Sequence, residues 1–324
     1  MSILIVMEQR SGVWNRMSLE TLGAAQQLAG ELKTTASAAV LGQGIEALAG
    51  DLAGKQLEKV YVVEHELLKE YTPDAYTAAL GQLLARVNPE YVLLPHTYQV
   101  RDFLPKLATA LGTVAVSDVV AHRVDAGALV LVRQLFQGKV NSDVRFTGAA
   151  PHFASLQAGA YRADQVVEGS AALEKFTPAL AAGDVRTRPL ERFRESARAV
   201  DLSAAELIVA VGRGITEADN IALIQELASV MGAELAASRP ICDAGWLPME
   251  RQVGSSGQTV GPKMYMAIGI SGAIQHLVGM KGSRIIVAIN KDPNAPIFEV
   301  ADYGIVGDLF QVVPELIDAL KKAK

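Results

Sequence analysis

The sequence has very little cysteine, few aromatic residues and no excess of positive charge. Its 324 residues contain one cysteine, Cys242, which excludes an internal disulfide and any metal site built from several cysteines. Lys and Arg number 30 against 35 Asp and Glu, a net charge of −5, and no basic block interleaved with aromatic residues occurs. A chain with this balance has no bulk attraction for phosphate polyanions, which argues against a nucleic-acid-binding protein.

Secretion and membrane signals are also missing. The first residues lack the basic segment and the small-residue cleavage site of a signal peptide, and a single cysteine suits a reducing compartment, so we expect a cytoplasmic protein. Residues 264–280 are uncharged and reach the lower limit of about 17–25 residues for a transmembrane helix. They include Ser271, Gln275 and His276, so a buried strand, a turn and a helix explain them better. We therefore expect no membrane insertion.

Apolar material is abundant. Half of the residues are hydrophobic, 20% are charged and the mean hydropathy is +0.22, which excludes disorder of the whole chain and provides for large cores. The length exceeds a typical domain of about 100–150 residues, so two domains are expected.

Short apolar runs alternate with amphipathic segments in the first half of the chain. Strands are predicted at residues 3–7, 36–41, 60–63 and 91–95, and helices at 18–33 and 74–87, with Ser18 as the N-cap of the first helix. This alternation predicts a parallel sheet covered by helices on both faces. After Gly112, runs at 119–124, 129–136 and 139–146 are separated by glycines and predict antiparallel hairpins at the sheet edge.

The composition changes between residues 174 and 204. This span contains two prolines, five arginines, interspersed acids and few large apolar residues, which is typical of a charged connector, although a solvated surface helix explains part of it equally well. We predict an N-terminal α/β domain over residues 1–185 that faces a partner, a linker over 186–204 and a second α/β domain over 205–324. In the latter, strands are expected at 206–212, 264–270, 283–290 and 305–306, and helices at 216–231 and 314–322.

Three segments of the second domain have the character of ligand loops. Gly212-Arg213-Gly214 follows a strand and precedes a helix, where phosphates bind in α/β sheets; Glu217 replaces the third glycine of the dinucleotide motif, so a tight turn is the alternative. Residues 252–257 form a hydroxyl-rich loop between glycines, which is either a ligand loop or an exposed flexible one. Ser238 and Arg239 lie near Asp243, with which Arg239 can pair at the surface.

The strongest local signal is the run from residue 265 to residue 276. A strand leads into Ser271 as the expected N-cap of a helix, whose free N–H groups favour an electron-rich group. Gln275 and His276 are polar residues in this apolar run, which indicates a bound polar ring, whereas no second metal ligand lies nearby. No catalytic motif accompanies these loops, so the sequence indicates a carrier rather than an enzyme that makes or breaks bonds.

The same segments carry a resemblance to a known family. Residues 212–320 resemble the alpha subunit of electron-transfer flavoproteins, through the matching segments 212–214, 237–239, 243–245, 252–254, 269–276, 287–293 and 300–306. The resemblance implies a heterodimer with a beta subunit and one FAD held mainly by the C-terminal domain. The predicted fold class is therefore α/β with two domains: an N-terminal parallel sheet with antiparallel additions and a C-terminal doubly wound FAD-binding domain.

The resemblance also implies roles for individual residues. Arg213 would contact the phosphate or ribityl region. Ser238 and Arg239 would lie near the isoalloxazine, with Arg239 over the ring. The flavin edge would be contacted by Val253, Gly254, Ser255 and Ser256, the last near N5; the family commonly has Gln-Thr where this chain has Ser255-Ser256. The pyrophosphate, ribityl chain and pyrimidine end would be held by Ser271, Gly272, Ala273, Ile274, Gln275 and His276, the last near O2. The adenosine part would be held by Asn290, Asp308 and Leu309.

Function follows from the resemblance as an expectation. The leading interpretation is a soluble electron carrier that accepts electrons from flavin dehydrogenases such as acyl-CoA dehydrogenases, in fatty acid oxidation, and passes them to a quinone reductase. One alternative is a subunit of a flavin-based oxidoreductase or of an electron-bifurcating complex that uses NADH. Another is a nucleotide-binding structural subunit without redox turnover.

Overall fold

The chain is divided into two compact units. The computed structural model describes residues 2–136, 138–190 and 202–323. One unit comprises Met1–Leu135 and Asn141–Phe193, and the other comprises Phe136–Val140 and Arg194–Lys324. Most of the predicted linker, residues 191–201, lies outside the described residues.

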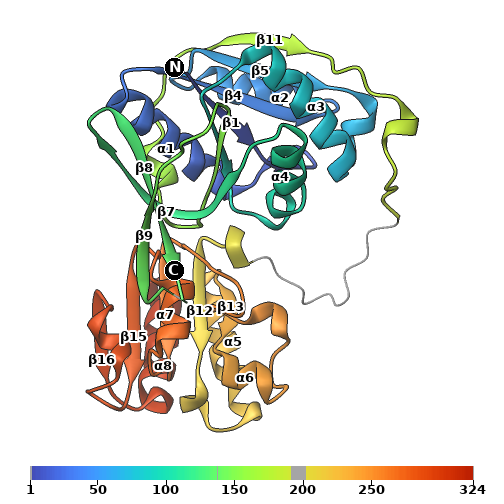
Figure 1. Ribbon diagram of the computed structural model, residues 1–324. Helices are drawn as coiled ribbons and strands as arrows, with labels where there is room; N and C mark the ends of the chain where they lie inside the picture. The colour runs from blue at the N-terminus through green and yellow to red at the C-terminus, as the bar shows by residue number, and fades with distance from the viewer. Residues whose placement is uncertain (1, 137, 191–201, 324) are drawn as a thin grey trace. The chain divides into compact units, whose positions relative to one another are not determined.

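The first unit is built on one large sheet (Figure 1). Its strand order is β11-β5-β4-β1-β6-β10-β7-β8-β9, and the pairings from β11 to β7 are parallel, whereas β7 and β8 are antiparallel. The strands are β1 (Ser2–Met7), β4 (Thr35–Gly42), β5 (Lys59–Glu64), β6 (Tyr91–Pro95), β7 (Ala115–Asp125), β8 (Ala128–Leu135), β9 (Val140–Val144), β10 (His152–Leu156) and β11 (Ala172–Phe176). The predicted parallel sheet with antiparallel additions is confirmed.

Helices cover both faces of this sheet. Successive residues of β1 point to opposite faces: Ile3 and Ile5 pack with α1 and α2, whereas Leu4 and Val6 pack with α3 and α4. Burial on both faces explains the continuous apolar run that β1 shows in the sequence. The helices are α1 (Arg16–Glu31), α2 (Glu46–Ala53), α3 (Pro73–Val87) and α4 (Tyr98–Ala110).

Several local features of this unit differ from the prediction, which also omitted α2 and α4. Helix α1 begins at Arg16, because the Asn15 side chain accepts a hydrogen bond from the Met17 amide and acts as the N-cap. Ser18 lies inside the first turn, where its hydroxyl donates to the carbonyl of Glu8. Strand β11 comes partly from the segment predicted as connector, since it pairs with the edge strand β5 and tolerates charged side chains there. Strand β10 was not predicted.

The second unit contains a five-stranded parallel sheet in the order β13-β12-β14-β15-β16 (Figure 1). The strands are β12 (Leu207–Val211), β13 (Glu234–Ala237), β14 (Met264–Ile268), β15 (Ile286–Asn290) and β16 (Tyr303–Val306). Residues of α5 (Ile221–Met231), α6 (Arg239–Asp243) and α8 (Leu309–Ala323) form one core cluster against the sheet. The cluster on the other face includes residues of α7 (Ile274–Met280). The doubly wound arrangement is confirmed, although β13 was not predicted and α8 starts earlier than expected.

The uncharged run at residues 264–280 is divided between β14 and α7. Within the described part of the chain, no helix combines the length and the apolar character that crossing a bilayer requires.

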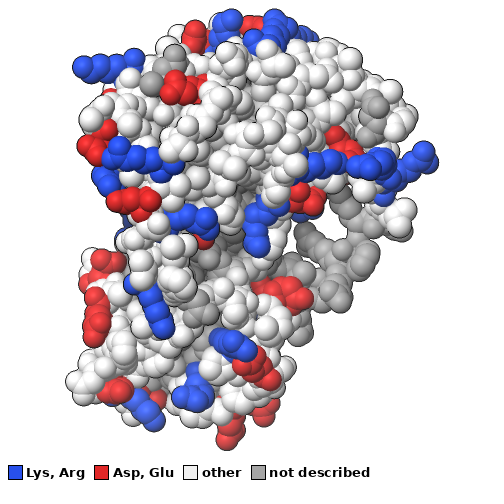
Figure 2. All heavy atoms as spheres, viewed as in Figure 1, with Lys and Arg blue, Asp and Glu red and all other residues white. Residues whose placement is uncertain are grey.

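Charges of both signs are interspersed over the drawn face of each unit (Figure 2). This distribution agrees with the nearly balanced composition of the chain.

One carboxyl group in the first unit is buried. Glu20 of α1 is 4% exposed, its carboxylate accepts a hydrogen bond from the Gly159 amide at 2.8 Å, and Arg16 lies 3.3 Å away. Burial outweighs both interactions and raises the pKa of Glu20 to about 7. The proton is therefore held more tightly in the folded chain than in the unfolded one.

We expect Glu20→Gln to stabilise the protein in a pH-dependent way. The folded pKa is above the ordinary value of 4.5, so the stability that Glu20 contributes is complete below pH 4.5 and is lost as the pH rises through about 7. The variant should gain about 1–2 kcal/mol over the wild type between pH 5.5 and pH 8, measured by denaturant unfolding. Glu66→Gln, at an exposed position, is the control and should show no such trend. An equal effect at both pH values would show that Glu20 is ionised throughout.

Candidate functional site

The candidate site lies at the carboxyl edge of the sheet in the second unit. From β12 the chain passes to β13 on one side and then to β14 on the other, so the connections diverge between β12 and β14. Open α/β sheets bind ligands at such a topological switch point. A pocket of about 690 Å³ is found there, lined by residues that follow β12, β13, β14 and β15. Its volume lies within the range of about 300–1,000 Å³ that is usual for ligand sites.

Backbone-to-backbone contact joins the turns after β12 and β14. The Gly214 amide donates a hydrogen bond to the Gly269 carbonyl at 3.0 Å. A Cβ atom added to Gly214 would lie 2.7 Å from the Cα of Gly269, closer than any side chain allows. The motif at residues 212–214 is therefore a tight turn, and the side chain of Arg213 in its middle lines the pocket.

A second contact of this kind attaches the hydroxyl-rich loop to α7. The Ser255 amide donates to the Gln275 carbonyl at 2.7 Å, and a Cβ atom on Gly279 would lie 2.4 Å from the amide nitrogen of Gly254. Gly254 has φ +144°, a conformation that favours glycine. The loop is thus held against the helix, with Ser255 and Ser256 lining the pocket.

Two buried polar atoms of the pocket have no partner. Gln252 is 1% exposed; its Nε2 donates to Ser256 Oγ at 2.9 Å, whereas its Oε1 makes no hydrogen bond. His276 is also buried, and its Nδ1 makes no hydrogen bond. A buried polar atom without a partner costs about 1–3 kcal/mol, so both atoms fit a site that a polar ligand completes.

The protonation state of His276 follows from its surroundings. Burial lowers the pKa of His276 to about 4, although the nearby Val253 carbonyl acts in the opposite direction. The ring is therefore neutral at pH 7. Its Nε2 lies 3.0 Å from the hydroxyl of Tyr265, a fully buried side chain of β14. We assign the Tyr265 hydroxyl as donor, because it has no other acceptor among the described residues, which places the ring proton on Nδ1.

The charge of the pocket comes from three cations, Arg213, Arg239 and Lys291. No Asp or Glu is among the described residues that line it. Arg239 Nε lies 3.2 Å from Asp243 Oδ2, so the surface ion pair that the sequence suggested does form, with both side chains more than half exposed. A pocket with this excess of positive charge suits a ligand with anionic groups.

Most of the residues predicted from the sequence line this one pocket. They are Arg213, Ser238, Arg239, Val253, Gly254, Ser255, Ser256, Ser271, Ala273, Gln275, His276 and Asn290. The pocket is also lined by residues that the sequence analysis did not assign to it, namely Gly214, Thr216, Pro240, Gln252, Gly269, Ile270 and Lys291. Of these, Gln252 and Lys291 are direct neighbours of predicted residues, so extending each predicted segment by one residue would have included them.

Four predicted residues do not line the pocket. Gly272 packs against the chain at Ile297, whose amide nitrogen a Cβ atom would approach to 2.3 Å. Ile274 is 53% exposed. Asp308 precedes α8 and its carboxylate accepts a hydrogen bond from the Phe310 amide at 2.9 Å. Leu309 is buried in the core between α8 and the sheet.

The expected N-cap of α7 is also different. The helix begins at Ile274 with Ala273 as its N-cap, so Ser271 lies before the helix. Gly272, with φ +87°, bends the backbone between them. Ser271 remains at the pocket through the strand-to-helix turn rather than through the helix itself.

Comparisons with known proteins agree with this geometry. Residues 3–181 match the family model described as electron transfer flavoprotein domain, and residues 201–281 match the electron transfer flavoprotein FAD-binding domain. The chain is 40% identical to electron transfer flavoprotein subunit alpha of Thermoanaerobacterium thermosaccharolyticum, over 99% of this chain and 98% of that protein. It is 37% identical to the same subunit of Bacillus subtilis, over 99% and 97%. The chain belongs to the electron transfer flavoprotein alpha-subunit family.

A further relative of this family has a different name. The chain is 35% identical to the acryloyl-CoA reductase electron transfer subunit beta of Anaerotignum propionicum, over 99% of this chain and 96% of that protein. The predicted cofactor is confirmed: the second unit is the FAD-binding domain of an electron transfer flavoprotein.

We expect His276 to remain neutral from pH 8 down to about pH 5, because its pKa is about 4. The measurement is long-range ¹H–¹⁵N NMR of ¹⁵N-histidine-labelled protein, with His276→Gln assigning the resonance among the five histidines. A His276 signal that titrates between pH 6 and pH 7 would contradict the burial argument.

We also expect Tyr265→Phe to lower the unfolding free energy by about 1 kcal/mol, the value of one hydrogen bond, and to release the ring from a single tautomer. Tyr303→Phe, which removes a hydroxyl from an exposed side chain, is the matched control and should change neither property.

Proposed function

We propose that this chain is the FAD-carrying alpha subunit of a heterodimeric electron carrier. Its partner is an electron-transfer flavoprotein beta subunit, its electron donors are flavin dehydrogenases of the acyl-CoA dehydrogenase type, and its acceptor is a quinone reductase of the respiratory chain. The observation that carries the proposal is a cationic pocket at the switch point of an FAD-binding domain, with no carboxylate among the described residues that line it. FAD supplies the reversible uptake and release of electrons, and the protein supplies position and electrostatics.

The pocket residues divide into two groups by chemistry. Arg213 and Lys291 are exposed cations without an ion pair in the described chain, so they are available for the phosphates of FAD. The hydroxyl and amide groups of Ser256 and Gln252 suit the edge of the flavin. Ser256 Oγ already accepts a hydrogen bond from Gln252, so its own hydrogen is free to be donated to the ligand.

The rest of the pocket supports a carrier over an enzyme with acid–base catalysis. His276 binds its proton weakly, with a pKa of about 4, and no carboxylate lines the pocket among the described residues. Cys242 does not line it, and burial raises the pKa of its thiol to about 11, so the thiolate is scarce at neutral pH. The side chains present offer hydrogen bonds and positive charge rather than a general base.

A second candidate function rests on the relative named as an electron transfer subunit of acryloyl-CoA reductase. In this alternative the chain is a subunit of a flavin-based oxidoreductase or of an electron-bifurcating complex that uses NADH. The alternative needs a second flavin outside this chain.

Flavin content and NADH reactivity distinguish the two functions. For the heterodimer purified with its beta subunit, we expect one FAD per heterodimer, reduction by an acyl-CoA dehydrogenase with its substrate, and no reduction by NADH under anaerobic conditions. Two flavins with rapid reduction by NADH would establish the alternative, and a flavin-free heterodimer would exclude both functions.

We expect the positive charge of Arg239 to raise the one-electron reduction potential of the bound FAD. Reduction adds negative charge, which a nearby cation stabilises; a unit pair about 4 Å apart at an effective dielectric constant of about 20 interacts by about 4 kcal/mol before screening. The Arg239 side chain is 65% exposed and pairs with Asp243, and both facts weaken its interaction with the flavin. We therefore expect an interaction energy of about 1 kcal/mol, which corresponds to roughly 40 mV for one electron.

Arg239→Ala should therefore lower the one-electron midpoint potential of the bound FAD by a few tens of millivolts in a redox titration, and Arg239→Lys should lower it less because the charge is kept. Lys281→Ala removes an exposed cation that does not line the pocket and should leave the potential unchanged. An unaltered potential in Arg239→Ala would show that this side chain does not act on the flavin.

A further inference from the structure

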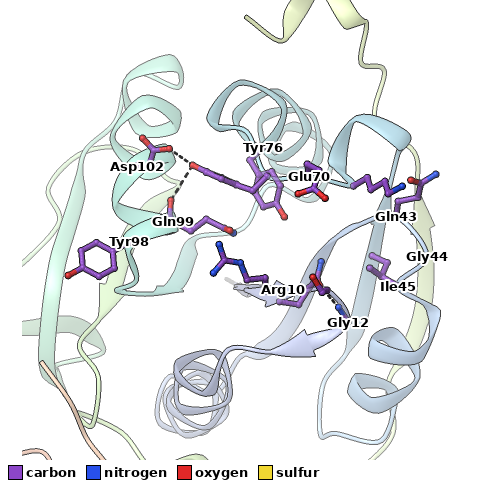
Figure 3. A pocket seen from close by; sticks show the side chains of 14 residues that line it. Arg10, Gly12, Gln43, Gly44, Ile45, Glu70, Tyr76, Tyr98, Gln99 and Asp102 are labelled. Carbon is purple, nitrogen blue, oxygen red and sulfur yellow. Dashed lines mark hydrogen bonds between the residues drawn. The ribbon is translucent and has the colours of Figure 1, made fainter. Parts of the chain in front are cut away.

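The first unit has a pocket of its own at the corresponding place in its sheet (Figure 3). From β1 the chain adds β4 and β5 on one side and then passes to β6 on the other, so the switch point lies between β1 and β6. A pocket of about 570 Å³ is lined by residues that follow the carboxyl ends of these four strands. None of the residues that line it belongs to the FAD pocket.

A hydroxyl that has no hydrogen-bond partner among the described residues faces this pocket. Tyr76 of α3 is 6% exposed, and its hydroxyl makes no hydrogen bond with any described residue. Burial and the negative charge of Glu8 raise the pKa of Tyr76 well above its usual value, so the group is a neutral O–H donor. In Figure 3 its oxygen points into the space that the other side chains surround. The oxygen is not among the fully buried polar atoms that lack a partner, so it is reached from the pocket and can donate a hydrogen bond to a ligand there.

A cation is held at the same place by a short hairpin. Strands β2 (Gln9–Arg10) and β3 (Val13–Trp14) are joined by Ser11 and Gly12, which both have positive φ. The Gln9 side chain donates to the Leu41 carbonyl and accepts from the Gly12 amide, both at 3.1 Å, which fixes the hairpin. Arg10 then extends into the pocket, and its guanidinium forms no hydrogen bond or ion pair with any described residue (Figure 3). It is therefore available for an anion.

The first turn of α4 adds an aromatic face and amide donors. Tyr98 and Gln99 open this helix and line the pocket, and the start of a helix presents unpaired N–H groups to an anion. Tyr98 is 72% exposed, with the Arg101 guanidinium 5.4 Å from its ring centroid on one face, so its other face can accept a planar ring.

Carboxylates in the lining favour a composite ligand over a simple anion. Asp102 accepts a hydrogen bond from the Tyr71 hydroxyl at 2.7 Å, so its charge is already engaged. Glu70 lies opposite Arg10 across the pocket in Figure 3. Glu70 already has another interaction and stands beside the cation Lys69 in the lining, and its carboxylate oxygens can accept a further hydrogen bond from a sugar hydroxyl. A ligand with an anionic end, sugar hydroxyls and a planar ring matches these groups of the lining.

We propose that this pocket binds a nucleoside monophosphate. The phosphate is held by Arg10 and the amides at the start of α4, the sugar hydroxyls face Glu70, the Tyr76 hydroxyl donates a hydrogen bond to the ligand, and the base stacks on Tyr98. The proposal concerns the first unit alone and does not depend on the function proposed for the FAD pocket.

The experiment is equilibrium titration of the FAD-loaded heterodimer with adenosine, guanosine and uridine 5′-monophosphate, and separately with adenosine and with inorganic phosphate. We expect at least one nucleotide to bind, and Arg10→Gln to weaken that binding about ten-fold or more, because a charge-assisted hydrogen bond is lost. Lys33→Gln, the same charge change at an exposed position of this unit, should bind like the wild type. The flavin spectrum and potential should be the same in all variants.

Tyr76→Phe is the more specific test, because its ring packing against Phe103 is kept. It should weaken nucleotide binding several-fold without lowering the melting temperature of the nucleotide-free protein, since the hydroxyl has no partner there. Nucleotide binding that is equal in wild type, Arg10→Gln and Tyr76→Phe would overturn the proposal, as would the absence of binding. Binding of inorganic phosphate as tight as that of any nucleotide would also overturn it.

Discussion

The pocket in the FAD-binding domain depends on contacts of backbone with backbone at glycines. At Gly214 and Gly269, and again at Gly254 and Gly279, two segments approach so closely that no Cβ atom fits between them. The first contact joins the turns after two neighbouring strands, and the second joins the hydroxyl-rich loop to α7. These four glycines position the polar side chains of the pocket, although glycine has no side chain with which to contact a ligand.

The electrostatics of the pocket build on this frame. Its fixed charge comes from exposed cations at the ends of strands, whereas its deepest polar groups, Gln252 and His276, are neutral and hydrogen-bonded on one side only. This division follows from desolvation: a charge at the depth of His276 would be costly, but a neutral donor or acceptor there is satisfied once a ligand supplies its partner. Exposed charge can attract an anionic cofactor, and buried dipoles can orient it.

Much of the fold and part of the site could be predicted from the sequence. Strands buried on both faces form continuous apolar runs in the sequence, so β1 and β6 could be predicted. β11 at the sheet edge carries charged residues and β13 is only four residues long, so neither forms such a run. Glycine-rich strand ends also indicated the pocket. What could not be predicted depends on three-dimensional turn geometry: Ser18 and Asn15 are equally good caps by composition, and nothing in the sequence shows that Asp308 caps a helix instead of facing the pocket.

The neutral state of His276 has a consequence for how the reduction potential varies with acidity. The ring gains its proton only near pH 4, and no carboxylate lines the described pocket, so the protein wall keeps a constant charge across the neutral range. Before reduction the wall therefore contributes no slope to a plot of potential against pH between about 5.5 and 8. A slope in that range counts the protons taken up with the electrons, by the cofactor and by any wall group whose pKa the added negative charge raises.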